Sequence, residues 1–403
     1  MDNTFSKFFT KTRLSEILLT VISVSITLVF VEIGLRIIKD DNRFLPYHTN
    51  STYYNYPSEK ISPGVSGVSA FSTNDLGLRG RPIEDEKYKI LTIGGSTTSD
   101  DILDDEETWS HQLMGFLNAE AGANEFVWVG SSGIAGKNSE HHVIHAKYLL
   151  PVLPTMDWVI IHAGTNDVGR WLYAKSYNEI PLMDKNQNAI EDVIGQSFRV
   201  SGYTPSDYPM YKRLEIWKLL SVAKNYFLVT YSAEYQDASI VMDRDLEWLE
   251  NERAKRKERK KKFIIRSKLN TLPVALSVYA ENLKQIISLV RQNGAEPVFV
   301  PQVMPGFKNM TEEDKERFWM GAMDGGDNYI DESQFVEMLQ YHNEKMKEVS
   351  ETMGVHYIDL PELLGNDPSL FYDNLHYNEH GARMVGQAIG RYFQQNIIAS
   401  GLN

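Results

Sequence analysis

The stretch YKILTIGGSTT, residues 88–98, joins a short apolar run to two glycines, a serine and two threonines. The apolar run 88–93 has the length and composition of a buried strand. Gly94 and Gly95 permit a tight turn after it and a close approach of the backbone to a ligand. Ser96 then stands where a helix would begin. Two interpretations are open at this point: Ser96 is a nucleophile displayed at a strand end, or it only caps the next helix.

Apolar strands and amphipathic helices alternate along most of the rest of the chain. Four further strands are predicted over 126–132, 157–167, 296–303 and 355–360, and helices over 107–122, 139–150, 277–294, 334–354 and 380–397. Such alternation produces a parallel sheet through right-handed crossovers. We therefore predict an α/β fold over residues 88–397, a three-layer α/β/α sandwich around a five-stranded parallel sheet. Ligands bind such sheets beyond the carboxyl ends of the strands.

One long interval, residues 170–275, interrupts the alternation. A crossover needs only about a dozen residues, so most of this interval is predicted to be an insertion. It is rich in Trp and Tyr and holds the basic run NERAKRKERKKKFIIRSK, residues 251–268. The run is interpreted either as a solvated helix or as a contact with anionic lipid headgroups or an acidic polymer. From position alone, we hypothesise that the insertion covers the active site and selects the substrate.

The N-terminal region carries a membrane-targeting pattern. Residues 17–31 contain no charged side chain, and the apolar pattern continues to Ile38. Glu32 and Arg36 are four apart, so on a helix they can pair at the membrane interface. We predict an uncleaved transmembrane anchor over residues 14–38. The alternatives are a cleaved signal peptide, for which no small-x-small cleavage site follows, and a buried globular helix.

The residues that flank the anchor bear on its orientation. Three basic residues precede the apolar segment and three follow it, so the positive-inside rule gives a near tie. The N-terminal amine and the acidic Asp40 and Asp41 favour residues 1–13 in the cytoplasm and the large domain outside it. We thus predict a single-pass protein of a bacterial inner membrane. Residues 39–87 are predicted to form a linker and an N-terminal extension that packs on the domain.

Composition excludes several classes of protein. The 403 residues suffice for one large domain with additions or for two domains. A net charge of −13 argues against a general nucleic-acid-binding protein, which needs a basic face. The absence of cysteine excludes disulfides, thiol catalysis and cysteine-ligated metal sites. The sequence has no phosphate-binding lysine motif and no dinucleotide fingerprint, and we predict neither a cofactor nor a metal.

Glycine and asparagine follow the second and third predicted strands. The string GSSGIAGKNSE, residues 130–140, contains Gly133 and Gly136, which allow a loop whose N–H groups point at the same sheet edge. Asn166, in the string AGTND, can donate its side-chain amide to an oxyanion. Each feature by itself is also compatible with an ordinary turn.

A carboxylate and an imidazole precede the last predicted helix. In DNLHYNEHG, residues 373–381, Asp373 and His376 lie three apart. This spacing lets one short segment present both groups together. The carboxylate can fix the tautomer of the imidazole, which can then accept a serine proton.

Serine, glycine and asparagine after the first three strands, with Asp-x-x-His before the last helix, resemble the SGNH (GDSL-like) hydrolase superfamily. The resemblance covers residues 88–169 and 277–397. The GGST string and the prelude TNDLGLRG, residues 73–80, resemble a membrane-anchored bacterial branch of it. The resemblance implies the flavodoxin-like SGNH fold and a serine hydrolase that acts on ester bonds.

The same resemblance implies a role for each site residue. Ser96 is the nucleophile, His376 is the general base, and Asp373 orients His376. The oxyanion hole is formed by the backbone N–H of Ser96, the backbone N–H of Gly136 and the side chain of Asn166.

Two details of the motifs bear on these assignments. Gly136 is preferred to Gly133 because the donor glycine of the family is the later one in its G-x-x-G loop. The common first block of the family is Gly-Asp-Ser-Leu, whereas Gly95 and Thr97 here replace the aspartate and the leucine. That aspartate is not the acid of the triad. The departure therefore affects the inference of substrate more than that of catalysis.

Four other histidines are candidates for weaker roles. His141 and His145 have the i,i+4 spacing of metal ligands, but no carboxylate completes a site, and a polar helix face is the alternative. His162 lies within an apolar strand and is predicted to be a packed core residue. His380 is predicted to be a helix cap or a surface residue.

The sequence therefore predicts a membrane-anchored serine esterase that acts through an acyl-enzyme. The expected substrates are O-acyl esters, including O-acetyl esters, of carbohydrate or envelope components. The alternatives are an O-acyltransferase for an extracytoplasmic polysaccharide, a lipase or lysophospholipase, and a non-catalytic binding protein. The complete set of site residues argues against the last alternative. The expected partners are the ester substrate and the membrane, not nucleic acid, and the oligomeric state is left open.

Overall fold

The computed structural model describes most of the chain, over residues 11–38, 44–121, 127–174, 191–200, 209–217, 219–220, 239–258, 261–262, 266–306 and 310–398. The chain divides into two compact units. The larger, here called the core unit, comprises Phe44–Val200 and Ala238–Asn403. The smaller, the N-terminal unit, comprises Met1–Arg43 and Ser201–Asp237.

The core unit is built on a five-stranded parallel sheet with the order β10-β7-β5-β3-β4. The strands are β3 (Tyr88–Gly94), β4 (Val127–Ser131), β5 (Trp158–Ala163), β7 (Glu296–Pro301) and β10 (His356–Tyr357). All five predicted strands are therefore present. The third ends at Ala163 rather than at residue 167, because a helix begins at Thr165, and the fifth covers only His356–Tyr357, because a helix begins at Leu360. Numbered along the chain, they lie in the order 2-1-3-4-5, which is the flavodoxin-like order of doubly wound sheets.

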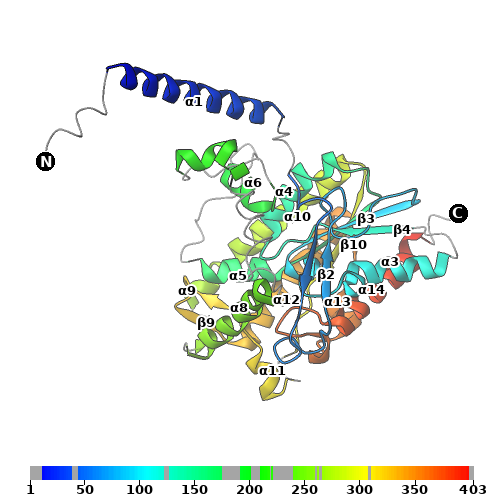
Figure 1. Ribbon diagram of the computed structural model, residues 1–403. Helices are drawn as coiled ribbons and strands as arrows, with labels where there is room; N and C mark the ends of the chain where they lie inside the picture. Colours follow the sequence, from blue (N-terminus) through cyan, green and yellow to red (C-terminus); the bar gives the residue numbers. More distant parts are fainter. Residues whose placement is uncertain are drawn as a thin grey trace. The chain divides into compact units, whose positions relative to one another are not determined.

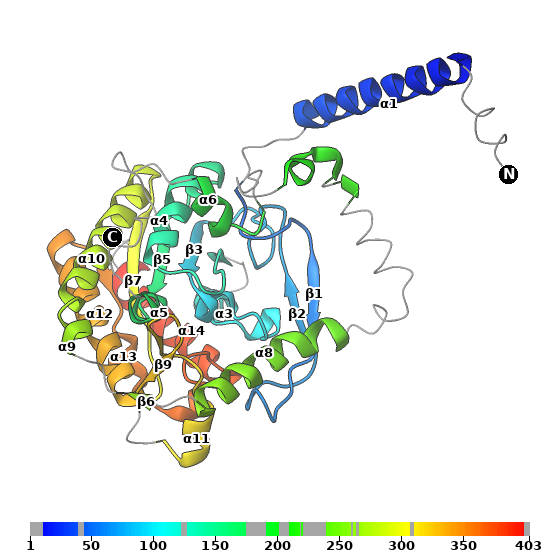
Figure 2. The ribbon, with the colours of Figure 1, turned by 90° about the vertical axis from the view of Figure 1, so that its left-hand side faces the viewer.

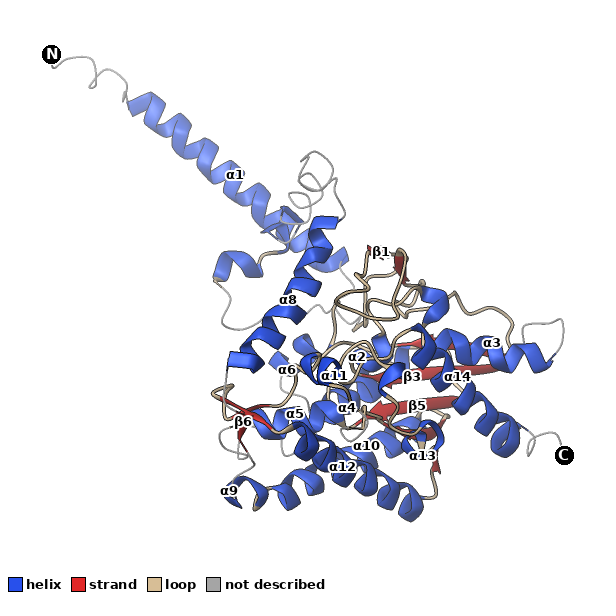
Figure 3. Ribbon diagram, turned by 90° about the horizontal axis from the view of Figure 1, so that it is seen from below, coloured by secondary structure: helices blue, strands red, loops and turns tan. Residues whose placement is uncertain are grey.

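Both faces of the sheet are buried because successive side chains of each strand point to opposite sides. Ile90 and Ile160 belong to the apolar cluster under α3 and α14, and Leu91 and Ile161 belong to the cluster under α4, α10 and α12. The helices are α3 (Trp109–Ala121), α4 (Ser139–Tyr148), α10 (Leu272–Gln292), α12 (Glu332–Met353) and α14 (Glu379–Phe393). Figures 1 and 3 show these helices on the two sides of the strands. The predicted three-layer sandwich is confirmed.

The covering helices follow from the spacing of their apolar residues. In α14, Ala382, Val385, Ile389 and Phe393 recur every three or four residues and are fully buried. In α10, Leu283, Ile286, Ile287 and Val290 form the equivalent stripe.

Elements of the predicted insertion belong to the core unit. α6 (Glu191–Ser197) packs against α4, whereas α8 (Ser239–Glu258), β6 (Lys261–Lys262) and α9 (Arg266–Leu269) follow later in the chain, and β6 is part of a small second sheet. Strand β6 joins β9 (Asn328–Ile330) and β8 (Ala322–Met323), and α11 (Glu312–Glu316) lies close by. Figure 2 shows one end of α8 beside β9 and α11. The core unit also contains the shorter helices α2 (Ser96–Ser99), α5 (Thr165–Tyr173) and α13 (Leu360–Leu364).

Part of the basic run is structural. Arg256 is buried and pairs with the equally buried Glu332 at 3.0 Å, and its guanidinium also donates to the Ile330 carbonyl. Arg253 donates to the carbonyls of Ile61 and Arg317. These two arginines attach α8 to other parts of the core unit, so neither the solvated helix nor the lipid contact accounts for them. Exposed members such as Lys257 fit the solvated interpretation.

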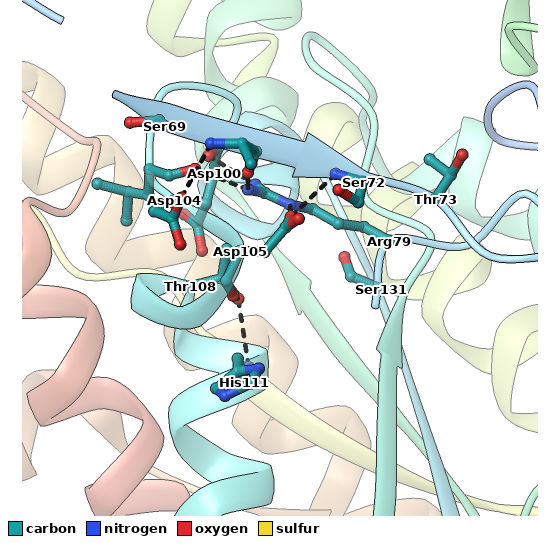
Figure 4. A network of polar contacts seen from close by, with 12 residues as sticks. Ser69, Ser72, Thr73, Arg79, Asp100, Asp104, Asp105, Thr108, His111 and Ser131 are labelled. Atoms are coloured by element: carbon teal, nitrogen blue, oxygen red, sulfur yellow. Dashed lines mark hydrogen bonds and ion pairs between the residues drawn. The ribbon is translucent and has the colours of Figure 1, made fainter. Parts of the chain in front are cut away.

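Residues 44–87 of the predicted N-terminal extension belong to the core unit. A hairpin of β1 (Thr52–Asn55) and β2 (Ser69–Ser72) lies in it, and the backbone of Arg79 pairs with that of Ser131 in β4. The Arg79 side chain is buried and makes five hydrogen bonds of 2.6–3.1 Å (Figure 4). The acceptors are the carbonyls of Ala70, Ser99, Asp100 and Leu103 and the carboxylate of Asp105. Arg79 thereby ties the extension to the segment that follows Ser96.

Replacing Arg79 with lysine is expected to lower the free energy of unfolding by about 2 kcal/mol. Lysine keeps the charge but offers three donors in place of the fixed fork of five, so buried carbonyls lose their partners. The measurement is urea unfolding of the full-length protein in detergent, followed by tryptophan fluorescence. Arg391→Lys, at an exposed position of α14, is the matched control. A loss no larger than that of the control would contradict the prediction.

The N-terminal unit contains the long helix α1 (Lys11–Ile38). Its segment Ser15–Ile37 is long and apolar enough to cross a membrane, and most of its side chains are exposed and none is buried. A signal sequence near an N-terminus has the same character. The predicted pair is present, since Arg36 Nε donates to Glu32 Oε1 at 2.8 Å. The Glu32 carboxylate also accepts from the backbone N–H groups of Glu215 and Ile216 at 3.1 Å.

Candidate active site

The predicted site residues meet at the carboxyl edge of the sheet. Ser96 is the first residue of α2, directly after β3, and Asn166 lies in the first turn of α5, directly after β5. Gly136 lies in the loop between β4 and α4, and Asp373 and His376 precede α14. All five line one cavity of about 610 Å³. Segments that are up to 280 residues apart in sequence are therefore brought together.

Three of these side chains form a continuous hydrogen-bonded relay. Ser96 Oγ lies 2.7 Å from His376 Nε2, and His376 Nδ1 lies 2.7 Å from Asp373 Oδ2. The other oxygen of Asp373 accepts from the backbone N–H groups of Leu375 and His376 at 2.8 and 2.7 Å. These bonds fix the carboxylate, which in turn fixes the plane of the imidazole. The predicted nucleophile, the predicted base and the carboxylate predicted to orient that base are thus within hydrogen-bond reach of one another.

The charges of the pair are set by burial and by each other. Burial acts to lower the pKa of His376, but the charge of Asp373 and its hydrogen bond offset this and raise the pKa above 6.5. Burial acts to raise the pKa of Asp373, and the His376 imidazolium with the backbone N–H bonds lowers it below 3.8. Asp373 is therefore ionised at neutral pH, where it stabilises a proton on His376.

This arrangement predicts the pH dependence of an activity that uses His376 as a base. Below the pKa of His376, kcat/KM should fall about tenfold per pH unit, because the protonated imidazole cannot accept the Ser96 proton. Because Asp373 raises this pKa, the midpoint should lie above 6.5. The measurement is kcat/KM for p-nitrophenyl acetate from about pH 5 to about pH 9, corrected for spontaneous hydrolysis. A midpoint below the ordinary histidine value would contradict the prediction.

The oxyanion donors predicted from sequence face the same cavity. Asn166 Nδ2 donates one hydrogen to the Lys137 carbonyl at 2.8 Å, which orients the amide and leaves its second hydrogen for a ligand. Gly136 adopts φ +76, a left-handed conformation that favours glycine, and lines the cavity. The N–H of Gly133 instead donates to Ser131 Oγ at 3.2 Å. The geometry therefore favours Gly136 over Gly133 as the donor.

Gly95 lies against the Asn166 amide. A Cβ atom at position 95 would collide with Asn166 Nδ2 and would lie 3.1 Å from the Lys137 carbonyl. The absence of a side chain at Gly95 therefore lets the Ser96 turn and the Asn166 amide approach each other. The sequence showed that Gly95 departs from the common family block, but not this contact.

Gln302, just after β7, links the turn that holds Ser96 to the turn that holds Asn166. Its Nε2 donates to Thr97 Oγ1 at 2.6 Å, and its Oε1 accepts from the Thr165 backbone N–H at 2.5 Å. Each contacted residue is the immediate neighbour of Ser96 or Asn166. Gln302 was not predicted from sequence, although its position at the end of a predicted strand was a usable signal.

Aromatic side chains form a wall beside His376. The rings of Tyr372 and Trp319 lie nearly parallel to the imidazole, with centroids 5.3 and 6.1 Å away. Trp319 Nε1 also donates to Asp373 Oδ2 at 2.8 Å. Trp248 of α8 packs edge-on against Trp319 and lines the cavity with Leu249. Helix α8 of the predicted insertion thus lines the cavity, and the selection of the substrate by the insertion stays a hypothesis.

Trp319 carries no signal in the sequence that marks it as a site residue. It lies in an irregular segment between β7 and α12, outside every motif, and contacts a residue 54 positions away. Tyr372 is the immediate neighbour of Asp373 and could have been considered for that reason.

The other histidines have structural surroundings. His162 is buried as predicted, with Nδ1 3.0 Å from the Val300 carbonyl. His380 is exposed in the first turn of α14. His145 is buried and its Nε2 lies 2.6 Å from the Ser197 carbonyl, so a polar helix face is wrong for this residue because α6 covers it. Across the described ranges, no group of three His, Asp or Glu side chains is placed to hold a metal ion.

Comparisons with known proteins give likenesses in structure but not in sequence. No protein-family model matches the chain, and no curated protein matches it. Among similar solved structures is LAE5, an alpha/beta hydrolase enzyme from the metagenome of Lake Arreo, at 11% identity and a TM-score of 0.38, covering 75% of this chain and 94% of that one. Est24, a carbohydrate acetylesterase from Sinorhizobium meliloti, has 12% identity and a TM-score of 0.37, covering 79% and 100%. A lipolytic G-D-S-L family member from Veillonella parvula has 11% identity and a TM-score of 0.36, covering 76% and 99%.

Proposed function

We propose that the protein is a serine esterase. The observation that carries the proposal is the Ser96–His376–Asp373 relay, with two contacts of 2.7 Å, in a cavity that also holds Gly136 and Asn166. A serine hydroxyl needs a base within hydrogen-bond reach to attack a carbonyl, and this base is itself oriented by a buried carboxylate.

The proposed reaction has two steps that use the same residues. His376 accepts the proton as Ser96 Oγ bonds to the ester carbonyl carbon, and the oxyanion receives hydrogen bonds from Asn166 Nδ2 and from the N–H groups of Gly136 and Ser96. Protonated His376 then donates its proton to the leaving alkoxide, and an acyl-enzyme and an alcohol result. Water, deprotonated by His376, attacks the acyl-enzyme and releases the acid and Ser96.

The proposed substrates are O-acyl esters, including O-acetyl esters, of carbohydrate or envelope components. The cavity of about 610 Å³ has room for an ester with a bulky alcohol. Its aromatic wall of Trp248, Trp319 and Tyr372 offers flat apolar surfaces for ring-shaped groups.

The esterase is further proposed to be held in the membrane by α1, with the core unit outside the cytoplasm. The candidate span Ser15–Ile37, with no buried residue, supports the anchor. An alkaline phosphatase reporter fused after residue 403 should be active in intact cells, because this reporter is active outside the cytoplasm. Activity of a cytoplasmic reporter at the same place would overturn the orientation.

The esterase function is tested with purified full-length protein in detergent. We expect release of acid from p-nitrophenyl acetate and from an O-acetylated oligosaccharide, with slower turnover of a long-chain p-nitrophenyl ester. Product analysis with an added sugar acceptor separates hydrolysis from acyl transfer. If no ester in the series is cleaved and no acyl group is transferred, the proposal is wrong.

A further inference from the structure

A second cavity adjoins the catalytic cavity and is here called the second compartment. It has a volume of about 370 Å³ and shares four lining residues with the catalytic cavity: Gly136, Asn166, Trp319 and Met320. Gly136 and Asn166 are two of the three proposed oxyanion donors, and Trp319 stacks beside His376. The two cavities therefore meet where the ester carbonyl and the leaving oxygen must lie.

The second compartment is lined by polar side chains that include both hydrogen-bond donors and hydrogen-bond acceptors. Asn138, His141, Arg170 and Glu252 face it, and Tyr173, with 54% of its surface exposed, forms part of its wall. The catalytic cavity also has apolar lining residues, Ile102, Trp248 and Leu249, beside the polar Ser62, Asp101 and Arg199. The two substituents of an ester carbonyl would thus meet different environments.

The charges around the second compartment are compensated by the protein itself. Arg170 forms an ion pair with Glu140, and Glu252 accepts from Lys255 Nζ at 2.6 Å. Burial, with a smaller effect of the Lys137 cation, lowers the pKa of His141 to about 3, so this imidazole is neutral. A bound group therefore does not need to carry a charge.

We propose that the second compartment is a subsite for a neutral sugar ring in the alcohol part of the ester. The inference rests on the esterase function proposed above. A sugar presents hydroxyl groups that donate and accept, which Asn138, Arg170 and Glu252 complement, and apolar C–H faces, which pack on the Tyr173 and Trp319 rings.

Other ligand classes fit the second compartment less well. An acyl chain placed there would bury apolar surface against a carboxylate and a guanidinium, which must lose water without a new partner. A phosphate or carboxylate would need a cation free to pair with it, whereas the Arg170 guanidinium already pairs with Glu140. The apolar lining residues of the catalytic cavity, Ile102, Trp248 and Leu249, are better suited to contact the acyl group.

The subsite is tested with two acetyl esters that differ only in the alcohol: p-nitrophenyl acetate and a mono-O-acetylated glucose tetrasaccharide. Tyr173→Ala and Glu252→Gln should each raise KM for the saccharide ester about tenfold, equivalent to about 1.4 kcal/mol, and leave that for p-nitrophenyl acetate within about twofold. Tyr341→Ala, at an exposed position of α12, is the matched control and should change neither value.

A binding measurement separates this inference from the esterase function. The unacetylated tetrasaccharide is titrated into full-length Ser96→Ala protein, and its Kd should rise about tenfold when Tyr173→Ala is added. The subsite is refuted if Tyr173→Ala and Glu252→Gln leave the KM for the saccharide ester unchanged and Tyr173→Ala leaves the saccharide Kd unchanged. It is also refuted if the two variants change the KM values of the two esters equally. If the wild type cleaves neither ester, the esterase proposal fails, and the saccharide Kd alone then decides for or against the subsite.

Discussion

Ser96→Ala is expected to lower kcat for p-nitrophenyl acetate by about 10⁴- to 10⁶-fold. The alanine has no oxygen to form the acyl-enzyme, and His376, with its Nε2 2.7 Å from Ser96 Oγ, loses the proton that it would accept. His376→Ala should cost a similar factor, because the hydroxyl then has no base. The double variant should be no slower than either single variant, since residues that act as one unit are strongly non-additive.

A fluorophosphonate probe provides a measurement that does not depend on the choice of ester. It should label the wild-type protein at Ser96 and should label neither Ser96→Ala nor His376→Ala. Ser288→Ala, at an exposed serine of α10, is the matched control and should keep both labelling and activity. Full labelling of Ser96→Ala would show that another residue is the nucleophile and would contradict the assignment.

The architecture of the core unit could be predicted because it is encoded locally. Strands such as β3 and β5 are short apolar runs that end in small residues, and helices such as α14 repeat apolar residues every three or four positions. Alternation then selects a parallel sheet, and a parallel sheet gathers the strand ends at one edge. The placement of Ser96, Gly136 and Asn166 around one cavity follows from that topology.

The parts that could not be predicted depend on contacts between distant segments without a repeating pattern. Trp319 reaches Asp373 from an irregular segment, and Gln302 joins two turns through single hydrogen bonds. In both cases a single side chain makes the contact, so no periodicity or spacing in the sequence predicts it. Only the folded chain shows that these residues hold the site together.

Arg79 and Arg256 illustrate the same limit for charged residues. In sequence, Arg79 belongs to a turn of the prelude, and Arg256 belongs to a run of basic residues that suggests a solvated helix. Both side chains are only 3–4% exposed, because carbonyl groups and a carboxylate surround each guanidinium. Arginine is suited to such places since its planar donors match several acceptors at once.

Gly95→Ala is expected to lower kcat by about 10²- to 10³-fold, the cost of losing one oxyanion donor. The new Cβ would collide with Asn166 Nδ2, and the Lys137 carbonyl at 3.1 Å blocks an easy adjustment. The amide must rotate or move away from the oxyanion. Asn166→Ala should have a loss of the same size, because it removes the same hydrogen bond. The measurement is kcat for p-nitrophenyl acetate, with circular dichroism melting of every variant.

The double variant Gly95→Ala with Asn166→Ala shows whether Gly95→Ala lowers kcat by displacing the Asn166 amide. If Gly95 acts by making room for Asn166, the double variant should be no slower than Asn166→Ala alone, since the collision has lost its partner. Gly115→Ala, at a glycine of α3 with open space around its Cβ position, controls for the change of residue type and should keep full activity. Losses that multiply in the double variant, or a Gly95→Ala protein that loses activity only because it unfolds, would contradict this account. An aspartate at position 95, as in the common family block, would meet the same amide, so in this chain the glycine is a requirement of the geometry around Asn166.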